Sequence, residues 1–467
     1  MPSTKPDNLT YLAGFGNHFS SEALPGALPA NQNTPQNCPY GLYAEQLSGT
    51  AFTSPRQENR RTWLYRVLPS ACHQPLVKAP ADGTVVSPLM VANFSGSSAS
   101  AQDGRVQVTP TQLRWKPFAI EPNLAHDFVQ GLRTLAGAGD PGLGDGLAIH
   151  VYCCTQDMQQ KAVYSADGDW LIVPQQGALI IQTEFGRMQV APNEVCVIPR
   201  GIRYRVELPD GPSRGYILEV FKGHFDLPDL GPIGANGLAN PRDFQTPVAA
   251  YDQAEVHANA PQDWQIVAKF QGEFFVADQD HTPFDVVAWH GNYVPFKYNL
   301  AHFCAVNSVT FDHMDPSIFT VLTCRSAVPG TALADFVIFP PRFEVQQRTF
   351  RPPYFHRNVM SEFMGIIHGQ YEAKRDGFLP GGATLHSTMT PHGPDTATVR
   401  DATARDLQPG RVADHSQAFM FETCLMLKVT KWALEDSMAV DQNYYRAWSN
   451  MPRTFDPTAT PKGSSQD

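Results

Sequence analysis

Histidine and glutamate side chains gather in the last third of the chain, at spacings that could hold a metal ion. Six of the 15 histidines lie between residues 302 and 392, and four of these lie between residues 356 and 392. His356 and Glu362 are an even number of residues apart, so an extended strand would point both side chains to one face. Two neutral imidazoles and one carboxylate form the facial triad that suits non-haem Fe(II). The pattern therefore predicts a metal site, which the ligand types alone would also allow Mn or Zn to fill.

The third ligand has two candidates, both placed after a turn at Pro380-Gly381-Gly382. His386 and His392 are again an even number of residues apart, so both could reach the same pocket. Spacing does not choose between them. A His–Glu pair on a strand also occurs as a hydrogen-bonded core pair, and that structural interpretation stays open beside the metal site.

Short strands and tight turns are expected to position these side chains. Ile202, Tyr204 and Val206 alternate with charged residues, a pattern typical of a half-buried antiparallel strand. Together with turn signals before it, this strand predicts a β-meander from residue 149 to residue 221. A second β-rich region spans residues 301–430, and its last apolar residues, from Phe419 to Val429, are expected on one face of a long strand.

One helix is expected before the first of these β-rich regions. Leu124, Phe128, Leu132 and Leu135 recur at helical spacing, Pro122 stands near the start, and glycines follow at 137 and 139. The rest of the chain is expected to be mainly β. We therefore divide it into an elaborated N-terminal β-rich domain (1–300), a C-terminal β domain that carries the metal site (301–440) and a C-terminal tail (441–467).

Composition restricts the classes of function. The 467 residues are enough for about two or three domains. The net charge of −10 disfavours binding to nucleic acid, and no basic patch that would offset it is visible in the sequence. No apolar run approaches the ~20 residues of a membrane span, and the first residues lack the apolar core of a secretory signal. The eight cysteines do not form a disulfide framework. A cytoplasmic protein that binds neither membrane nor nucleic acid is expected.

Two stretches resemble the motifs of cupins, which are small antiparallel β-barrels that often hold a metal. The His356-x-Asn358-x3-Glu362 pattern is similar to the first motif, with Asn358 in place of its second histidine. Residues 186–204 resemble the second motif, but Tyr204 stands where a cupin has its ligand histidine. The resemblance implies two cupin-like jelly-roll domains. The N-terminal one is expected to be metal-free, because no neighbouring His–Glu pair is visible in the sequence around Tyr204.

Longer stretches resemble the homogentisate 1,2-dioxygenase family over nearly the whole chain, excluding the extreme termini. The similar stretches are Tyr11–Asn17, Cys38–Ala51, Trp289–Tyr293, Phe311–Thr323, His356–Gly365 and Leu385–Pro394. The resemblance implies Fe(II)-dependent extradiol-type cleavage of homogentisate by O2 to 4-maleylacetoacetate, in phenylalanine and tyrosine catabolism. It also implies a homo-hexamer built as a dimer of trimers.

The same resemblance assigns roles to single residues. It implies that His356, Glu362 and His392 are the iron ligands, with His392 also against the substrate. It implies that His386 either supports a ligand or lies on the substrate side. It makes His313 the acid–base histidine and Tyr371 a substrate-contacting tyrosine. Two residues depart from the family pattern, namely His18, where a glutamate is expected, and Met314, where a smaller residue is expected beside His313.

Two other functions remain as alternatives at this point. The chain could be a cupin dioxygenase or isomerase for another phenolic acid, such as gentisate, since no motif shows how a substrate carboxylate is bound. It could instead be a metal-free bicupin that stores or binds other molecules. The complete set of His356, Glu362 and His392 argues against the storage protein, which needs no metal ligands.

Overall fold

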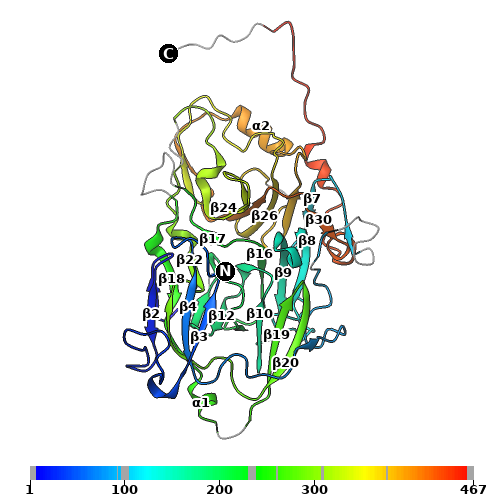
Figure 1. Ribbon diagram of the computed structural model, residues 1–467. Helices are drawn as coiled ribbons and strands as arrows, with labels where there is room; N and C mark the ends of the chain where they lie inside the picture. Colours follow the sequence, from blue (N-terminus) through cyan, green and yellow to red (C-terminus); the bar gives the residue numbers. More distant parts are fainter. Residues whose placement is uncertain are drawn as a thin grey trace.

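The structure is a computed structural model that describes residues 7–91, 93–95, 105–229, 238–258, 261–306, 310–374 and 377–459. In these residues the chain is mainly β, as the sequence predicts, and most strands belong to three large sheets (Figure 1). No helix in the described part of the chain is long and apolar enough to cross a membrane. Of the expected C-terminal tail, residues 460–467 lie outside the described residues.

The largest sheet is buried on both faces. Leu171 and Val173 of its strand β11 pack into one core, whereas Trp170 and Ile172 pack into another on the opposite face. Side chains of both faces are therefore apolar, which removes the alternation that marks a half-buried strand. In spatial order its strands are β1 (Tyr11–Ala13), β18 (Phe244–Pro247), β22 (Phe296–Asn299), β14 (Glu194–Ile198), β11 (Asp169–Gln176), β16 (Ser213–Val220), β9 (Asp145–Cys154), β8 (Leu132–Asp140), β30 (Lys428–Thr430) and β6 (Val106–Gln107).

A seven-stranded sheet covers one face of this central sheet. Its strands are β13 (Gly186–Val190), β12 (Leu179–Thr183), β15 (Tyr204–Glu207), β10 (Lys161–Ser165), β19 (Trp264–Phe270), β20 (Glu273–Gln279) and β5 (Val77–Lys78). The half-buried strand predicted around Tyr204 is confirmed as β15, which pairs antiparallel with β12. The predicted meander is wrong, because the chain passes from β11 to this sheet and then returns to the central sheet at β14 and again at β16.

A second seven-stranded sheet packs on the other face and carries the histidine cluster. Figure 1 shows β24 and β26 of this sheet above β16 and β9 of the central sheet. Its edge strands come from the first half of the chain, while β30 from the second half joins the central sheet, so the two halves exchange strands. The strands are β17 (Phe225–Asp226), β23 (Thr320–Arg325), β24 (Ala332–Phe339), β29 (Gln417–Thr423), β26 (Ser361–His368), β27 (Ala383–His386) and β7 (Leu113–Trp115).

Two expectations about single elements are wrong. The stretch from Phe419 to Val429 is not one strand, since β29 and β30 belong to different sheets. The expected helix near residue 130 is a turn followed by strand β8. Leu132 and Leu135 fall into opposite cores, with a register shift between them, so their helical spacing reflects a strand buried on both faces.

Smaller elements complete the structure. A four-stranded sheet holds β2 (Phe19–Glu22), β21 (Val286–Gly291), β4 (Arg61–Arg66) and β3 (Tyr43–Ser48), and a two-stranded sheet holds β25 (Arg342–Glu344) and β28 (Gly410–Val412). The α-helices are α1 (Gln253–Val256) and α2 (Thr396–Ala404). Short 3-10 helices cover Pro39–Gly41, Pro141–Leu143, Pro241–Asp243, Leu300–His302, Pro316–Phe319 and Tyr444–Trp448, and a π-helical turn covers Trp432–Asp436.

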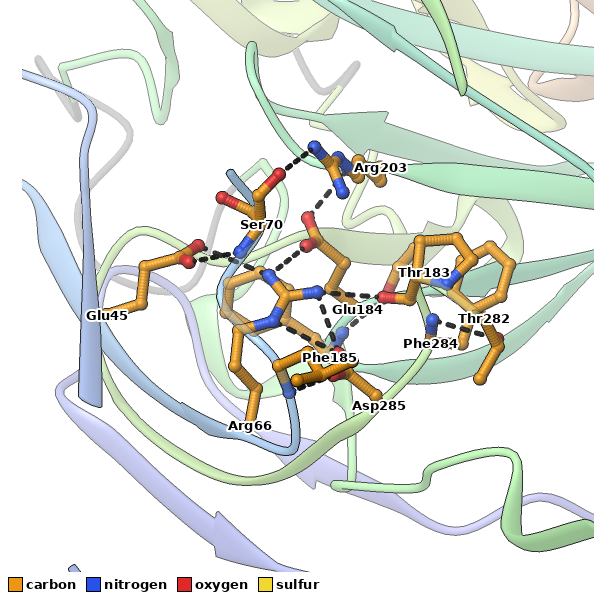
Figure 2. Close-up of polar contacts among 12 residues, drawn as sticks. Glu45, Arg66, Ser70, Thr183, Glu184, Phe185, Arg203, Thr282, Phe284 and Asp285 are labelled. Atoms are coloured by element: carbon orange, nitrogen blue, oxygen red, sulfur yellow. Dashed lines mark hydrogen bonds and ion pairs between the residues drawn. The ribbon is translucent and has the colours of Figure 1, made fainter. Parts of the chain in front are cut away.

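A buried ion network joins the four-stranded sheet to its neighbours. Figure 2 shows the Arg66 guanidinium between the carboxylates of Glu184 and Asp285, with both contacts at 2.8 Å, and Glu45 farther out at 3.2 Å. Arg203 donates to the carbonyl of Ser70 above them. Because the buried Arg66 guanidinium is paired with buried carboxylates of Glu184 and Asp285, this network fixes the packing of β4.

Candidate metal centre and substrate pocket

Three side chains from separate segments converge on one point. The Nε2 atom of His356 lies 3.1 Å from one carboxylate oxygen of Glu362, and Nε2 of His392 lies 3.0 Å from the other. One possible ligand atom from each residue lies within 4.8 Å of the others. The structure therefore brings together the three residues that the resemblance implies as ligands.

The backbone that positions them differs from the predicted strand. Glu362 lies in β26, but His356 precedes that strand and is separated from it by loop residues 357–360. His356 instead forms an isolated bridge to His392, with backbone N–H···O bonds of 3.0 and 3.1 Å. His356 and Glu362 were expected to be close because an even spacing on one strand would point both side chains to the same face. That explanation is wrong, because the two residues do not lie on one strand. Pairing between two loops brings the imidazoles to the start of β26.

Hydrogen bonds at the far side of each imidazole orient the pair. Nδ1 of His356 donates to the carbonyl of Tyr354 at 2.9 Å, and Nδ1 of His392 donates to the carbonyl of Thr390 at 3.0 Å. Burial alone would raise the pKa of the Glu362 carboxyl, but the hydrogen bonds from His356 and His392 hold it well below its usual range. The carboxylate is therefore ionised and faces two imidazole nitrogens.

The alternative third histidine lies directly behind the cluster. His386 ends β27 and is buried, and its ring is parallel to that of His392 with the ring centres 4.1 Å apart. Its Nε2 faces the hydroxyl of Tyr444 at 2.9 Å rather than Glu362. Burial, followed by the charge of Lys374, lowers the pKa of His386 well below its usual range. His386 thus supports His392 and does not belong to the converging set.

A cavity of about 480 Å³ opens onto these side chains and is lined by both His313 and Tyr371. Nδ1 of His313 donates to the carbonyl of Met314 at 2.7 Å, while its buried Nε2 has no hydrogen-bond partner in the described part of the chain. The buried Tyr371 ring packs edge-on against Phe339. The volume suits a single-ring aromatic ligand.

The two departures from the family pattern lie in different places. Met314 is buried and lines the cavity, and its carbonyl rather than its side chain orients His313. His18 lines a separate surface pocket near Arg61 and does not reach this cavity. Of the two departures, Met314 is therefore the one in contact with the site.

Comparison with known proteins identifies the family of this chain. Residues 10–300 match the family model described as homogentisate 1,2-dioxygenase N-terminal, and residues 301–455 match the one described as homogentisate 1,2-dioxygenase C-terminal. The chain belongs to the homogentisate 1,2-dioxygenase family. The resemblance seen in the sequence is thereby confirmed.

Individual relatives agree with this assignment. Homogentisate 1,2-dioxygenase of Drosophila melanogaster is 60% identical over 95% of this chain and 98% of its own length, and that of Homo sapiens is 55% identical over 97% and 98%. A cupin superfamily protein from Desulfitobacterium hafniense, at 16% identity and a TM-score of 0.18, covers 23% of this chain and 99% of its own. That last match is too remote to carry an argument.

Two polar residues of this family member's pocket were given no role in the site from the sequence. The amide of Asn358 donates to Glu362 at 3.2 Å and to Glu422 at 2.8 Å, so it bridges two carboxylates. Burial, and then the charge of Glu362, raises the pKa of Glu422 to about 7. The cupin-like motif pointed to position 358, but nothing in the sequence marked Glu422, which faces Glu362 only because β29 pairs with β26.

A buried lysine was also missed. Lys374 lines the cavity, and its ammonium contacts the hydroxyl of Tyr444 and lies 3.4 Å from Nε2 of His386. Tyr444 comes from the segment expected to be a tail, and the guanidinium of Arg114 from β7 lies 4.5 Å from the centre of its ring. Lys374, Tyr444 and Arg114 come together because β7 joins the second sheet and because the C-terminal segment folds back onto it. Neither feature can be recognised from the local sequence.

The N-terminal half contains a His–Glu pair that the sequence did not reveal. Nε2 of His150 in β9 lies 3.2 Å from the Glu219 carboxylate in β16, and both are fully buried. The expectation that no such pair exists near Tyr204 is wrong, because the pair forms across neighbouring strands. Lys269, however, places its ammonium 3.0 Å from the same carboxylate. Tyr204 itself is buried among Phe128 and Trp170.

Proposed function

We propose that this protein cleaves the ring of homogentisate with O2, using Fe(II) held by His356, Glu362 and His392. The observation that carries the proposal is the convergence of these three side chains beside an aromatic-sized cavity, in a chain that belongs to the homogentisate 1,2-dioxygenase family. The two alternatives, a gentisate enzyme and a metal-free storage protein, are not favoured by these comparisons.

The donor set fits a divalent cation. Each Nδ1–H is committed to a backbone carbonyl, so the hydrogen bond from His356 or His392 to the ionised Glu362 needs a second proton, on Nε2. When that proton leaves, the Nε2 lone pair and the carboxylate repel each other unless a cation lies between them, and a metal ion can be that cation. Two imidazoles and one carboxylate suit Fe(II). When bound, Fe(II) supplies open positions for the phenolic substrate and O2 and removes the spin barrier to their reaction.

His313 is the residue placed to take a phenolic proton. Its Nδ1–H is held by the Met314 carbonyl, so the neutral ring presents an unprotonated and unpartnered Nε2. Its ring packs edge-on against Tyr354, which in turn packs edge-on against His356. A neutral imidazole can accept a proton at a free nitrogen and return it in a later step. This arrangement gives the pocket a general base next to the metal ligands.

Substrate contacts are assigned to Tyr371, His392 and His386. Tyr371 lines the cavity and is held by aromatic packing, so its hydroxyl can donate a hydrogen bond from a fixed position. Burial raises the pKa of Tyr371 above its usual range, so the hydroxyl stays protonated. His392 and His386 line the same cavity as a stacked pair, and they would bound one side of the bound ring.

A hexamer, arranged as a dimer of trimers, is proposed from the family resemblance. Exposed apolar side chains beside the metal centre support an assembly contact, since Phe355, Val359 and Met389 are each more than half exposed. Met389 is joined to this loop through its backbone N–H, which donates to the Asn358 carbonyl at 2.7 Å. Free cysteines at all eight positions support a reducing compartment such as the cytoplasm.

Oxygen uptake tests the proposal directly. Purified protein, stripped of metal and then reconstituted, is expected to consume O2 with homogentisate only after Fe(II) is added, and to contain one iron per chain. Gentisate serves as the matched phenolic acid and is expected to give much slower uptake. Turnover of homogentisate by the metal-free protein, or a preference for gentisate, would contradict the proposal.

A further inference from the structure

An anionic substrate requires a cation in the pocket, and four cationic side chains line the cavity. They are Arg342, Arg351, Arg357 and Lys374. Homogentisate carries a carboxylate, and an unpaired charge taken from water into a protein interior is strongly unfavourable. The question is which of these cations is both buried and available.

Three of the four cations are already engaged or lie at the surface. Arg342 is paired with the Glu372 carboxylate, and Arg351 donates to main-chain carbonyls from each of its three guanidinium nitrogens. Arg357 is exposed. None of the three offers a buried charge without a partner.

Lys374 differs from them in both respects. It is only 4% exposed, and no carboxylate lies within ion-pair distance of its ammonium among the residues that the structure describes. Its polar contacts are the Tyr444 hydroxyl and Nε2 of His386, which are both uncharged groups. A buried ammonium with only neutral partners lacks the counter-ion that would stabilise it.

From this geometry we infer that Lys374 binds the carboxylate group of the aromatic-acid substrate. The inference rests on the proposed function and names the residue that recognises the acid. Lys374 lies on the same turn as Tyr371, and its backbone N–H donates to the Tyr371 carbonyl at 3.3 Å, so the backbones of the two residues are held together. Both residues line the same cavity, and Tyr371 is the residue proposed to contact the ring.

The electrostatics of Lys374 are consistent with this role. Burial, together with the nearby Arg114 guanidinium, lowers the pKa of Lys374 to about 7. An anion beside the ammonium would favour its charged form. The free pocket therefore holds a destabilised cation that a carboxylate stabilises, and a neutral ligand gains nothing from the same contact.

The test compares homogentisate with its neutral methyl ester on the Fe(II)-loaded protein. Lys374→Met is expected to lower kcat/KM for homogentisate by about 10–100-fold, as expected for loss of a hydrogen bond to a charged group, and to change kcat/KM for the ester by less than about twofold. Lys374→Arg keeps the charge and should retain most of the preference for the acid. Anaerobic calorimetry should show the same weakening for binding of homogentisate but not of the ester.

Matched controls separate this role from support of the metal centre. Tyr444→Phe removes a neutral partner of Lys374 and should leave the preference for the acid, while Lys78→Met removes an exposed lysine and should change neither substrate. An equal loss for acid and ester in Lys374→Met would overturn the inference. If that variant does not fold, Lys374→Gln gives the same ratio while keeping donors for Tyr444. Failure of the wild-type protein to oxidise homogentisate would instead overturn the proposed function.

Discussion

Each half of the molecule places a histidine against a buried glutamate, but of these two pairs the second has no ammonium or guanidinium beside it among the described residues. His150 lies 3.2 Å from Glu219 in the N-terminal half, and His356 lies 3.1 Å from Glu362 in the C-terminal half. In the first pair, the Lys269 ammonium lies 3.0 Å from the carboxylate. In the second, a further imidazole takes the corresponding place. The two pairs therefore differ in their third partner, which is an ammonium in the first and an imidazole in the second. An imidazole, unlike an ammonium, can be a metal ligand.

Solvent access separates the two sites as well. His150 and Glu219 are fully buried, whereas the His356 side chain is 29% exposed and lines the large cavity. Lys269 also contacts Asp167 at 2.6 Å, so its charge is shared by two carboxylates. Burial alone would lower the pKa of Lys269, but Glu219 and Asp167 raise it above its usual range. The N-terminal cluster is thus a closed ion network, and the C-terminal one is an open centre.

Replacing Glu362 or Glu219 with glutamine is expected to give the largest difference between the two sites, measured as Fe(II) binding. Glu362→Gln removes the one anionic residue of the proposed ligand set. The substitution should weaken Fe(II) binding by more than about 100-fold, which is the upper range for loss of a residue that only hydrogen-bonds to a ligand. O2 uptake should fall in proportion. Glu219→Gln should lower the thermal unfolding temperature and leave the iron content of folded protein unchanged. Anaerobic Fe(II) titration measures both, and full iron and activity in Glu362→Gln would mean that the triad is misassigned.

Replacement of a histidine that has a free nitrogen should affect catalysis rather than stability. His313→Asn is expected to lower kcat by about 10²–10⁴-fold, the usual contribution of a general base, with iron content and homogentisate binding largely intact. His150→Asn is the counterpart, because both nitrogens of His150 have partners, and it should act on unfolding alone. Loss of iron in proportion to activity in His313→Asn would show that His313 is a structural support.

Removal of the resident cation tests the N-terminal cluster. Lys269→Met leaves Glu219 and Asp167 buried without their counter-ion, so the free energy of unfolding should fall by about 3–5 kcal/mol. Urea unfolding measures this change, and iron per folded chain should stay constant. Lys78→Met removes an exposed ion pair with Glu273 and should cost less than about 1 kcal/mol. Equal effects of the two substitutions would show that the buried network contributes no more than a surface pair.

The sequence and its family resemblance predicted which side chains come together better than they predicted the backbone that brings them together. The residue types at 356, 362 and 392 pointed to a facial triad, and the resemblance chose His392 over His386. The backbone was predicted wrongly, since a single strand was expected where His356 and His392 pair across two loops. Residue spacing reports local conformation, and a bridge between distant loops leaves no trace in it.

Burial on both faces explains the other errors. Leu132 and Leu135 gave a helical period because each face of β8 meets a different core. The His150–Glu219 pair and Lys374 were missed for a related reason, since a lone charged residue looks the same in sequence whether it is buried or exposed. Which of these charged residues is buried depends on how the three large sheets pack together.

The smallest effect is expected at Tyr204, where a cupin would have its ligand histidine. Its buried hydroxyl has no hydrogen-bond partner among the described residues, so Tyr204→Phe removes an unsatisfied polar group and keeps the ring packing against Phe128 and Trp170. The free energy of unfolding should change by less than about 1 kcal/mol, because loss of an unpaired group carries no hydrogen-bond cost. Calorimetry measures this change, and metal analysis should still find one iron per chain. A fall in metal content would mean that the N-terminal half holds an ion near Tyr204, and the contrast between a closed and an open site would then be wrong.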